Sequence, residues 1–328
     1  METPLVSISL VAFNAEKYLG NAIEGCLQQE VDFSYEIIIH DDASTDNTPQ
    51  IILDYANKYP QKIIPIIQEE NQYSKGVEII AKFIVPKAKG KFIAFVEADD
   101  YWIDPKKLQR QVNFLESHPD YSMCFTATKH IYPETSKNPR IKRYINNDGL
   151  CPPKDVIIRG GSLLDMISAV SLKSIFDYIP NWYYYRHLWD VSIPLLALLK
   201  GKIQYQNEVT SVYRVNSPGS WTQNTARNYD KRKKNIKNSI RITDGFDEET
   251  GNKYHKFVNK KVNSMIVGLL LLTDYEDPDF DFYYQRLSPV KKIEYKIFNL
   301  LGSFRLWDKC RQITRFFTSN FRRWIHLK

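Results

Sequence analysis

The sequence predicts an α/β protein built around a mostly parallel sheet with helices on both faces. Short runs of Ile, Val and Leu alternate with segments of helical periodicity through the first 130 residues, and strands arranged in this way pair in parallel and are covered on both sides. The chain of 328 residues is 43% hydrophobic, which is enough for a buried core. Because ligands of such sheets bind at the carboxyl ends of the strands, the residues after each apolar run are candidate site residues.

The expected elements follow one another in a regular order. Strands are predicted over 5–12, 36–40, 63–67, 91–97 and 121–130, and helices over 17–28, 48–59, 77–87 and 105–117. Segment 132–160 is rich in Pro, Lys and Asn and lacks periodicity, which predicts a long loop or insertion between two halves. After it come a helix that ends at Leu199, a strand over 203–215 and a polar helical segment over 224–260.

Cysteine usage and hydropathy indicate the compartment. The four cysteines have no paired short spacing, so neither a zinc knuckle nor a disulfide framework is predicted. The amino terminus has no basic leader before its short apolar run. No uninterrupted apolar stretch reaches the ~20 residues that a bilayer-spanning helix needs. We therefore expect a cytoplasmic protein.

Three of the predicted strands end in polar residues. Phe13-Asn14 follows the first strand, the run HDDASTD follows the second, and the run EADDYW follows the fourth. A carboxylate pair such as Asp99-Asp100 suits Mg²⁺ or Mn²⁺ bound to a diphosphate, because these cations combine one or two carboxylates with phosphate oxygens and water. An acidic pair at a strand end also serves as a turn or a helix cap, and the residues at 44–46 are good N-cap residues, so each run alone leaves both roles open.

Three longer segments, taken together, carry a specific resemblance. VSISLVAFNAEKYLGNAIEGCLQQ, EIIIHDDASTDNT and GKFIAFVEADDYWIDPKKLQRQVNFLE, in this order and spacing, resemble the amino-terminal half of the family 2 inverting glycosyltransferases of the GT-A fold, of the kind that serve bacterial polysaccharide biosynthesis. The resemblance covers residues 4–130 and extends more loosely to 222. It implies a GT-A domain over 1–222, with a nucleotide-sugar half (1–130) and an acceptor half (131–222), and a helical carboxy-terminal extension over 223–328.

The resemblance also implies roles for residues on the donor side. Ala12, Phe13 and Asn14 match the segment that lines the nucleoside. Asp42 matches the aspartate that reads the base or ribose, and a carboxylate can accept a hydrogen bond from a uracil imide N–H.

The same resemblance places the metal. Asp99 and Asp100 match the ligands of Mn²⁺ or Mg²⁺ and of the ribose, with Asp100 on the metal and Asp99 nearer the ribose. Arg214 remains available for the diphosphate.

Inversion requires a base that removes the proton of the acceptor hydroxyl. In relatives this base is an Asp at the start of a helix, upstream of a strand that ends in Tyr-Arg, and the segment LWDVSIPLLALLKGKIQYQNEVTSVYRVNSPGSW has that layout. Asp190 is therefore the candidate base, and an ordinary helix N-cap is the alternative. The chain departs from the usual pattern at Trp189, where Gly is common, and at Asn216, where His is usual. His187 is a further polar residue near the candidate base.

The implied reaction is inverting transfer of a hexose or N-acetylhexosamine from a nucleotide-diphosphate sugar, with UDP as the expected nucleotide, to a hydroxyl of a glycan. The expected acceptor is a lipid-linked oligosaccharide of surface polysaccharide synthesis, and no nucleic-acid partner is expected. Two alternatives stay open: a sugar nucleotidyltransferase, and a catalytically silent glycan or membrane adaptor with the same fold. A dinucleotide-binding fold is disfavoured because no GxGxxG run follows the first strand.

The carboxy-terminal tail is basic and amphipathic. Ten Lys or Arg residues and two acids lie between Pro289 and Lys328, against a net charge of +7 for the whole chain. Apolar and aromatic residues recur every one, three or four positions from Ile297 to Trp324. This pattern predicts peripheral contact of 289–328 with an anionic membrane, which would place the protein at the inner face of the cytoplasmic membrane. The alternatives are a helix packed on the catalytic domain with a solvated basic face, or contact with nucleic acid.

Overall fold

A computed structural model of the chain describes residues 3–185, 189–217, 228–273 and 275–303. The chain divides into two compact units, residues 1–258 and residues 259–328. The boundary predicted at residue 222 therefore lies inside the first unit, which also contains helix α7 (Tyr229–Glu249).

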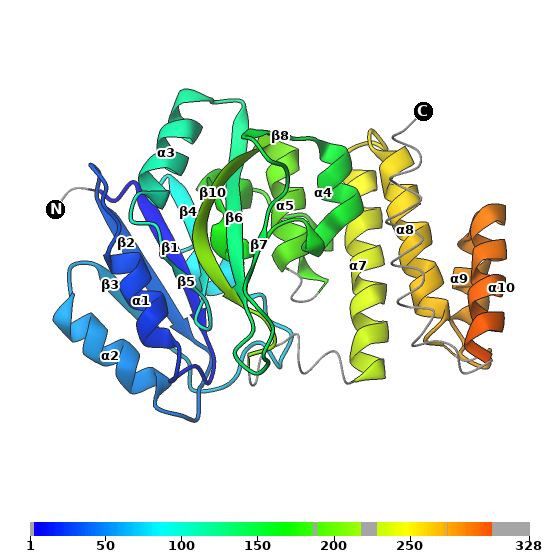
Figure 1. Cartoon of the computed structure of the whole chain (residues 1–328), viewed down its shortest axis with the longest axis horizontal. Helices are drawn as coiled ribbons and strands as arrows, with labels where there is room; N and C mark the ends of the chain where they lie inside the picture. Colours follow the sequence, from blue (N-terminus) through cyan, green and yellow to red (C-terminus); the bar gives the residue numbers. More distant parts are fainter. Residues whose placement is uncertain (1–2, 186–188, 218–227, 274, 304–328) are drawn as a thin grey trace. The chain divides into compact units, whose positions relative to one another are not determined.

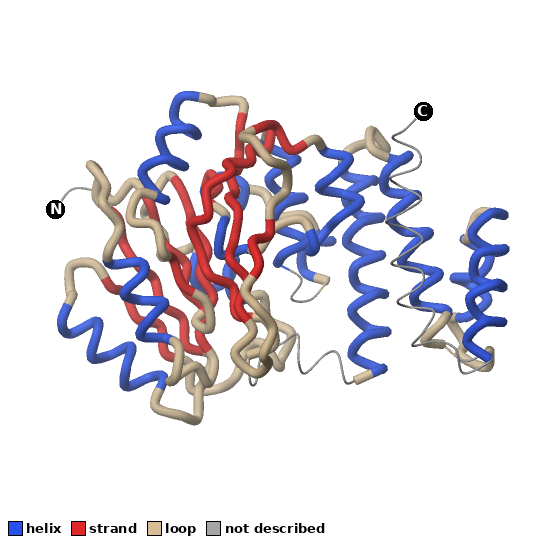
Figure 2. The backbone as a smooth tube through the Cα atoms, in the orientation of Figure 1, coloured by secondary structure: helices blue, strands red, loops and turns tan. Residues whose placement is uncertain are grey.

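The first unit is built on one ten-stranded sheet (Figures 1 and 2). The main path runs in the order β3-β2-β1-β4-β9-β6-β10-β5, while β7 pairs with β6 and β8 pairs with β10. β1 lies between β2 and β4 and is parallel to both, and β6 is parallel to β10. The strands are β1 (Val6–Ala12), β2 (Tyr35–Asp41), β3 (Ile63–Ile67), β4 (Phe92–Glu97), β5 (Tyr101–Trp102), β6 (Tyr121–Ile131), β7 (Arg140–Lys142), β8 (Gly149–Cys151), β9 (Val170–Leu172) and β10 (Lys202–Arg214).

Helices lie between most of these strands along the chain, and α7 follows the last strand, β10. They are α1 (Leu19–Leu27), α2 (Thr48–Lys58), α3 (Lys107–Ser117), α4 (Pro153–Arg159), α5 (Trp189–Lys200) and α7. Short helical turns complete the connections: η1 (Ile80–Ile84), η2 (Gly160–Ser162), η3 (Met166–Ser168), η4 (Lys173–Phe176) and η5 (Asn181–Tyr184). The expected α/β fold with a central sheet flanked by helices is confirmed. The sheet is mixed: β1, β2, β3 and β4 pair in parallel, as do β6 and β10, whereas β5, β7, β8 and β9 pair antiparallel to their neighbours.

The core shows why the apolar runs form these strands. Alternate residues of β1, β2 and β4, such as Ile8, Ile37 and Ala94, share one hydrophobic cluster with the buried sides of α1, α2 and α3, because side chains of a strand alternate between its two faces. The intervening residues, such as Ile38 and Phe95, are also buried. Burial of both faces explains why these strands read as continuous apolar runs.

Two predicted elements differ from the structure. Segment 132–160, predicted as a long loop, contains β7, β8 and α4. Strands of three residues are too short to show a period of two, and only their partners β6 and β10 define them. The helix predicted over 77–87 is a single π-helical turn, η1, which ends shortly before Pro86, because proline has no N–H with which to continue a helical hydrogen-bond ladder.

The second unit continues helix α8 (His255–Leu270), which begins in the first unit, and contains α9 (Phe280–Arg286) and α10 (Pro289–Ser303). α10 coincides with the start of the predicted amphipathic tail, and residues 304–328 of that tail lie outside the described residues. Within the described part of the chain, none of the helices combines the length and the apolar character that crossing a membrane requires.

A buried lysine in α3 gives the first prediction. The side chain of Lys107 is fully buried, donates to Oε1 of Gln111 at 2.7 Å and lies over the Trp102 ring. Burial lowers the pKa of Lys107 to about 7, whereas an unfolded lysine titrates near ~10.4. Between these values the unfolded chain binds the proton more strongly, so the native state is stabilised as pH rises.

We expect the free energy of unfolding of the wild type to rise, relative to that of Lys107→Met, as the pH is raised from about 7 to about 10. Urea unfolding of both proteins at several pH values measures this difference, and ionisations common to both proteins cancel. A difference that does not change with pH would contradict the assignment.

Candidate functional site

The polar residues that follow the apolar runs meet at one edge of the sheet. In the parallel register, Ala12 of β1 lies opposite Asp41 of β2, and Val11 lies opposite Glu97 of β4. The carboxyl ends of β1, β2 and β4 are therefore level, and the three runs that follow them lie side by side, as expected for a binding edge.

The run after β1 is tied to the run after β2. Asn14 has a φ of 48°, in the left-handed region that Asn tolerates. Its Oδ1 accepts from the backbone N–H of Thr45 at 2.8 Å, and its own N–H donates to Oγ of Ser44 at 2.8 Å. Ala12 is buried, and Phe13 is 51% exposed. Asn14 is exposed as well, but its side-chain oxygen is already engaged by Thr45, so the ring of Phe13 is the apolar surface that these three residues offer to a ligand.

Asp42 is buried, and its carboxylate holds a loop. Oδ1 accepts from the N–H of Gln72 at 2.8 Å, and Oδ2 accepts from the N–H of Tyr73 at 3.0 Å. The side-chain amide of Asn71 also donates to the carbonyl of Asp42. Each carboxylate oxygen has a second lone pair, so these contacts leave capacity for a further donor.

Asp99 and Asp100 lie at the end of β4 beside the end of β10. Asp100 is completely buried, and its Oδ1 accepts from the backbone N–H of Arg214 at 2.7 Å. Its Oδ2 has no hydrogen-bond partner among the described residues. Oδ2 of Asp99 accepts from the hydroxyl of Ser217 at 2.6 Å. The two adjacent acids therefore differ in burial and in partners.

Arg214 braces this pair. Its guanidinium lies between the rings of Tyr18 and Tyr101, at 4.7 Å and 4.6 Å from their centres. It donates to the backbone carbonyl of Asp99, not to a carboxylate. Asn216 follows shortly after Arg214 and has a φ of 58°. The family usually has His at this position, and Asn is a residue that tolerates the left-handed backbone that leads to Ser217.

Several carboxyl groups at this edge repel one another. Burial, and then the charge of Asp99, raise the pKa of Asp100 well above its ordinary value. Burial, and then the charges of Asp99 and Asp190, raise the pKa of Glu97 to about 8. Like charges in a shared buried site cannot all ionise without a compensating cation. The orphaned Oδ2 of Asp100 and this mutual repulsion both fit a hard divalent cation.

The cation would draw part of its ligand set from elsewhere. No group of three or more Asp, Glu, His or Cys side chains is arranged to hold a metal in the described ranges. A cation at this edge would therefore need ligands from a diphosphate or from water besides one or two carboxylates.

Glu97 is a site residue that the sequence analysis did not single out. It lies half-buried at the end of β4 and interacts electrostatically with Asp99 and Asp190. The signal was present in the sequence as the spacing Glu97-Ala98-Asp99 directly after an apolar strand, because the turn that ends the strand keeps these neighbouring residues at the same edge of the sheet.

Asp190 lies in the first turn of α5, where the predicted base was placed. Burial raises the pKa of Asp190, which makes the carboxylate a better proton acceptor. Gly161 lies directly against it: a Cβ at that position would meet Oδ2 of Asp190 at 2.1 Å and Cγ at 2.6 Å. The carboxylate therefore occupies space that only a glycine leaves open. His187, the other polar residue predicted near the base, lies outside the described residues.

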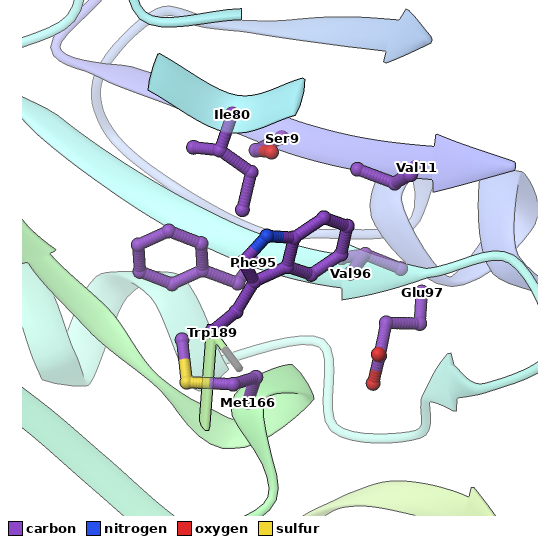
Figure 3. A pocket seen from close by; sticks show the side chains of 8 residues that line it. All are labelled: Ser9, Val11, Ile80, Phe95, Val96, Glu97, Met166 and Trp189. Atoms are coloured by element: carbon purple, nitrogen blue, oxygen red, sulfur yellow. The ribbon is translucent and has the colours of Figure 1, made fainter. Parts of the chain in front are cut away.

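Trp189 forms one wall of a pocket on the sheet, next to Asp190 (Figure 3). Its indole lies across β4, between Ile80 on one side and Met166 on the other, and the pocket reaches the carboxylate of Glu97. The full lining consists of Ser9, Val11, Ile80, Phe95, Val96, Glu97, Met166 and Trp189. The departure from the family pattern at position 189 thus lies in a pocket that adjoins the site through Glu97.

Comparison with known proteins agrees with this geometry. A family model described as Glycosyl transferase family 2 matches residues 7–168, the part that carries β1, β2, β4 and the acidic cluster. The chain carries a family 2 glycosyltransferase domain.

The curated relatives of this chain match over part of their length. An uncharacterized protein of Mycobacterium tuberculosis is 33% identical over 228 residues, which are 66% of this chain and 60% of that protein. The glucosyltransferase WfaP of Escherichia coli, described as acting from UDP-Glc on α-D-GlcNAc-diphosphoundecaprenol, is 38% identical over 113 residues, 34% of this chain and 42% of WfaP. The chain therefore spans less than two thirds of the length of these relatives.

Solved structures show the fold of this chain. TarS 1–349 of S. aureus in complex with UDP-GlcNAc superposes with a TM-score of 0.54 at 13% identity, over 94% of this chain and 91% of TarS 1–349. The mannosyltransferase PcManGT of Pyrobaculum calidifontis, in complex with GDP-Man and Mn²⁺, superposes with a TM-score of 0.51 at 13% identity, over 92% and 88%. The family 2 domain has the GT-A fold.

The acidic cluster generates the second prediction. When folding raises the pKa of an acid, the acid destabilises the folded state at every pH above its pKa in the unfolded chain. The cost grows with pH until the pH exceeds the pKa of the acid in the folded state. Asn at position 100 removes this cost and keeps the Oδ1 that accepts from Arg214. We expect Asp100→Asn to melt higher than the metal-free wild type at pH 7, by on the order of 2 °C or more.

Binding of Mn²⁺ to the native state should raise the melting temperature of the wild type, and the same substitution should abolish this rise. Thermal unfolding with chelator and with Mn²⁺ measures both effects. A variant that melts lower than the wild type without metal, or that keeps the full Mn²⁺ effect, would contradict the role of Asp100.

Proposed function

We propose that this chain is a metal-dependent, inverting glycosyltransferase that moves a hexose or N-acetylhexosamine from a UDP-sugar to a hydroxyl of a glycan. The observation that carries the proposal is the acidic cluster of Glu97, Asp99 and Asp100 at the carboxyl end of β4, with Asp190 close enough to raise the pKa of Glu97. Metal and base are thereby assigned to neighbouring parts of one site.

The donor would lie across the carboxyl ends of β1, β2 and β4. Asp100, with its orphaned Oδ2, and Asp99 would hold Mn²⁺ or Mg²⁺. The bound cation would offset the charge that develops on the diphosphate as the sugar–phosphate bond breaks. The PcManGT complex, which includes GDP-Man and Mn²⁺, supports the combination of a nucleotide sugar and a divalent metal in a protein of this fold.

Residues of the first two strand ends would hold the nucleoside. The half-exposed ring of Phe13 offers a surface for the base, Ala12 and Asn14 shape the turn beside it, and Asp42 offers a carboxylate lone pair to an imide N–H. UDP is the proposed nucleotide because WfaP is named for UDP-Glc and the TarS complexes hold UDP and UDP-GlcNAc. Arg214, already braced between two tyrosine rings, is the proposed cationic contact of the diphosphate.

Asp190 would act as the base. As the acceptor oxygen forms its bond to the anomeric carbon from the face opposite the nucleotide, its proton passes to the Asp190 carboxylate, the bond between the anomeric carbon and the phosphate oxygen breaks, and UDP leaves with the electron pair. The raised pKa of Asp190 favours acceptance of that proton. Because electrostatic coupling between two acids is mutual, a charged Glu97 would favour protonation of Asp190 further.

The proposed acceptor is a lipid-linked oligosaccharide at the inner face of the cytoplasmic membrane. The name of WfaP includes an undecaprenol-linked acceptor. On α10, the exposed apolar residues Val290, Ile293, Ile297 and Leu300 recur at helical spacing, a pattern that suits the headgroup boundary of a membrane. We propose residues 1–222 as the glycosyltransferase domain, divided at 130 between donor and acceptor halves, and 223–328 as a helical extension that supports peripheral membrane contact.

The third prediction tests the reaction. Asp190→Asn keeps the size of the side chain but removes its basicity, so UDP release from a UDP-sugar in the presence of Mn²⁺ and acceptor should fall by about two orders of magnitude or more. Binding of UDP with Mn²⁺, measured by calorimetry, should stay close to that of the wild type. Full transfer activity in the variant would remove Asp190 from the mechanism.

The wild-type calorimetry also separates the alternatives. Absence of UDP binding by the wild type, with and without Mn²⁺, would favour a silent adaptor, for which Trp189 and Asn216 are the supporting departures. Release of pyrophosphate from UTP and a sugar phosphate would favour a nucleotidyltransferase.

The fourth prediction uses the close approach of Gly161 to Asp190. A methyl group at position 161 would meet the carboxylate well inside contact distance, so the carboxylate must move. We expect Gly161→Ala to lower kcat by about tenfold or more, because small displacements of a catalytic group are costly, with UDP binding unchanged.

Gly149→Ala is the matched control, because its nearest neighbour is the flexible end of the Ile145 side chain at 3.2 Å. It should keep wild-type kcat. Equal kcat values for the Gly161 and Gly149 variants would contradict a role for the Asp190 position in turnover.

A further inference from the structure

Glu78 is a buried acid that the proposed chemistry does not use. It lies just before η1 and is 7% exposed. Its Oε2 accepts from the backbone N–H of Ala81 at 2.6 Å. Burial raises the pKa of Glu78 to about 7, and among the described residues no Lys, Arg or His contributes to that pKa. A buried acid without a cationic partner destabilises a fold, so its presence calls for an explanation other than packing.

The carboxyl group of Glu78 lies near buried polar groups of two helical elements, η5 and α5. The Tyr183 hydroxyl of η5 and the Trp189 indole of α5 lie close enough to its carboxyl group to lower its pKa against the effect of burial. Oε1 of Glu78, the Tyr183 hydroxyl and Nε1 of Trp189 are all buried, and none of the three atoms has a hydrogen-bond partner within the described ranges. Since buried polar groups are almost always paired, these three groups are one another's available partners.

Trp189 connects this cluster to the candidate base. It is the first residue of α5, and Asp190 is the next. Its indole packs between Ile80 and Met166 over β4 (Figure 3), so its ring position and the position of the first turn of α5 depend on each other. On the other side of that turn, Gly161 limits where the Asp190 carboxylate can lie.

We propose that Glu78 is a positioning residue: by accepting a hydrogen bond from the Trp189 indole it holds the first turn of α5, and with it the Asp190 carboxylate, where the acceptor proton is removed. The inference rests on the proposed function. The same stretch of chain also carries Gln72 and Tyr73, whose N–H groups hold Asp42. The segment between β3 and β4 therefore contacts the donor side and the acceptor side of the site.

A double-mutant cycle tests the proposal, with the full-length protein, a UDP-sugar, Mn²⁺ and acceptor. Glu78→Gln keeps the shape but replaces an acceptor-only carboxylate with an amide, and Trp189→Phe keeps a ring but removes the indole N–H. We expect Glu78→Gln to lower kcat by about tenfold, with KM for the donor changed by less than about twofold. In the Trp189→Phe background the same Glu78 substitution should have no further effect on kcat.

Glu70→Gln is the matched control on the same segment. Glu70 is exposed and its carboxylate contacts only Lys75 among the described residues, so kcat should stay at the wild-type value. An equal loss of kcat on Glu78 substitution in both backgrounds, or a rise in KM with kcat unchanged, would overturn the proposal.

The emission of Trp189 gives a readout that does not depend on turnover. The difference in fluorescence between the wild type and Trp189→Phe isolates the emission of this indole, and the same difference is taken between Glu78→Gln and the double variant. Loss of the Glu78 carboxylate should shift this emission, and an unshifted emission overturns the contact with Trp189. A wild type that releases no UDP from any donor overturns the proposed function instead, so the two failures are distinguishable.

Discussion

Burial of like charges at the carboxyl end of β4 is the constraint on which the rest of the site depends. Loss of water raises the pKa of both Glu97 and Asp100, and the charge of Asp99 raises both further. Backbone N–H groups and hydroxyls supply part of the compensation: Arg214 donates its N–H to Asp100, and Ser217 donates to Asp99. Among the described residues, no positive charge offsets the rest of this negative charge. A divalent cation that binds together with a diphosphate would offset it.

Asp165, another buried acid in the same region, has its negative charge fully compensated by nearby side chains. Asp165 accepts from His130 at 2.7 Å and pairs with Lys142 at 2.8 Å. Burial alone would raise the pKa of Asp165, but the hydrogen bond from His130 and the charge of Lys142 lower it to about 2. Asp165 is thus a charged structural residue at neutral pH, whereas no cation among the described residues is paired with Glu97 or Asp100. Such divergence of pKa values between neighbouring acids is typical of functional sites.

The sequence by itself determined the order and type of most elements of the first 130 residues. Strands that are buried on both faces have continuous apolar sequences, and the helices that cover them have amphipathic periodicity. It also placed the acidic pair at a strand end and Asp190 at a helix start, where the structure has them. Short strands such as β7 and β8 were not predictable, since their partners and not their own periodicity define them. The π-turn η1 was not predictable either, because its apolar spacing reads as an ordinary helix.

Only the tertiary structure decided how the acids differ. Asp99 and Asp100 are neighbours of the same residue type, yet packing against β10 buries Asp100 and leaves one of its oxygens unpartnered among the described residues, while Ser217 partners Asp99. The pKa values of Glu97 and Glu78 likewise depend on groups that come near these side chains only in the folded structure. Burial and charge proximity are properties of the folded arrangement, and they set protonation and metal affinity more strongly than residue identity does.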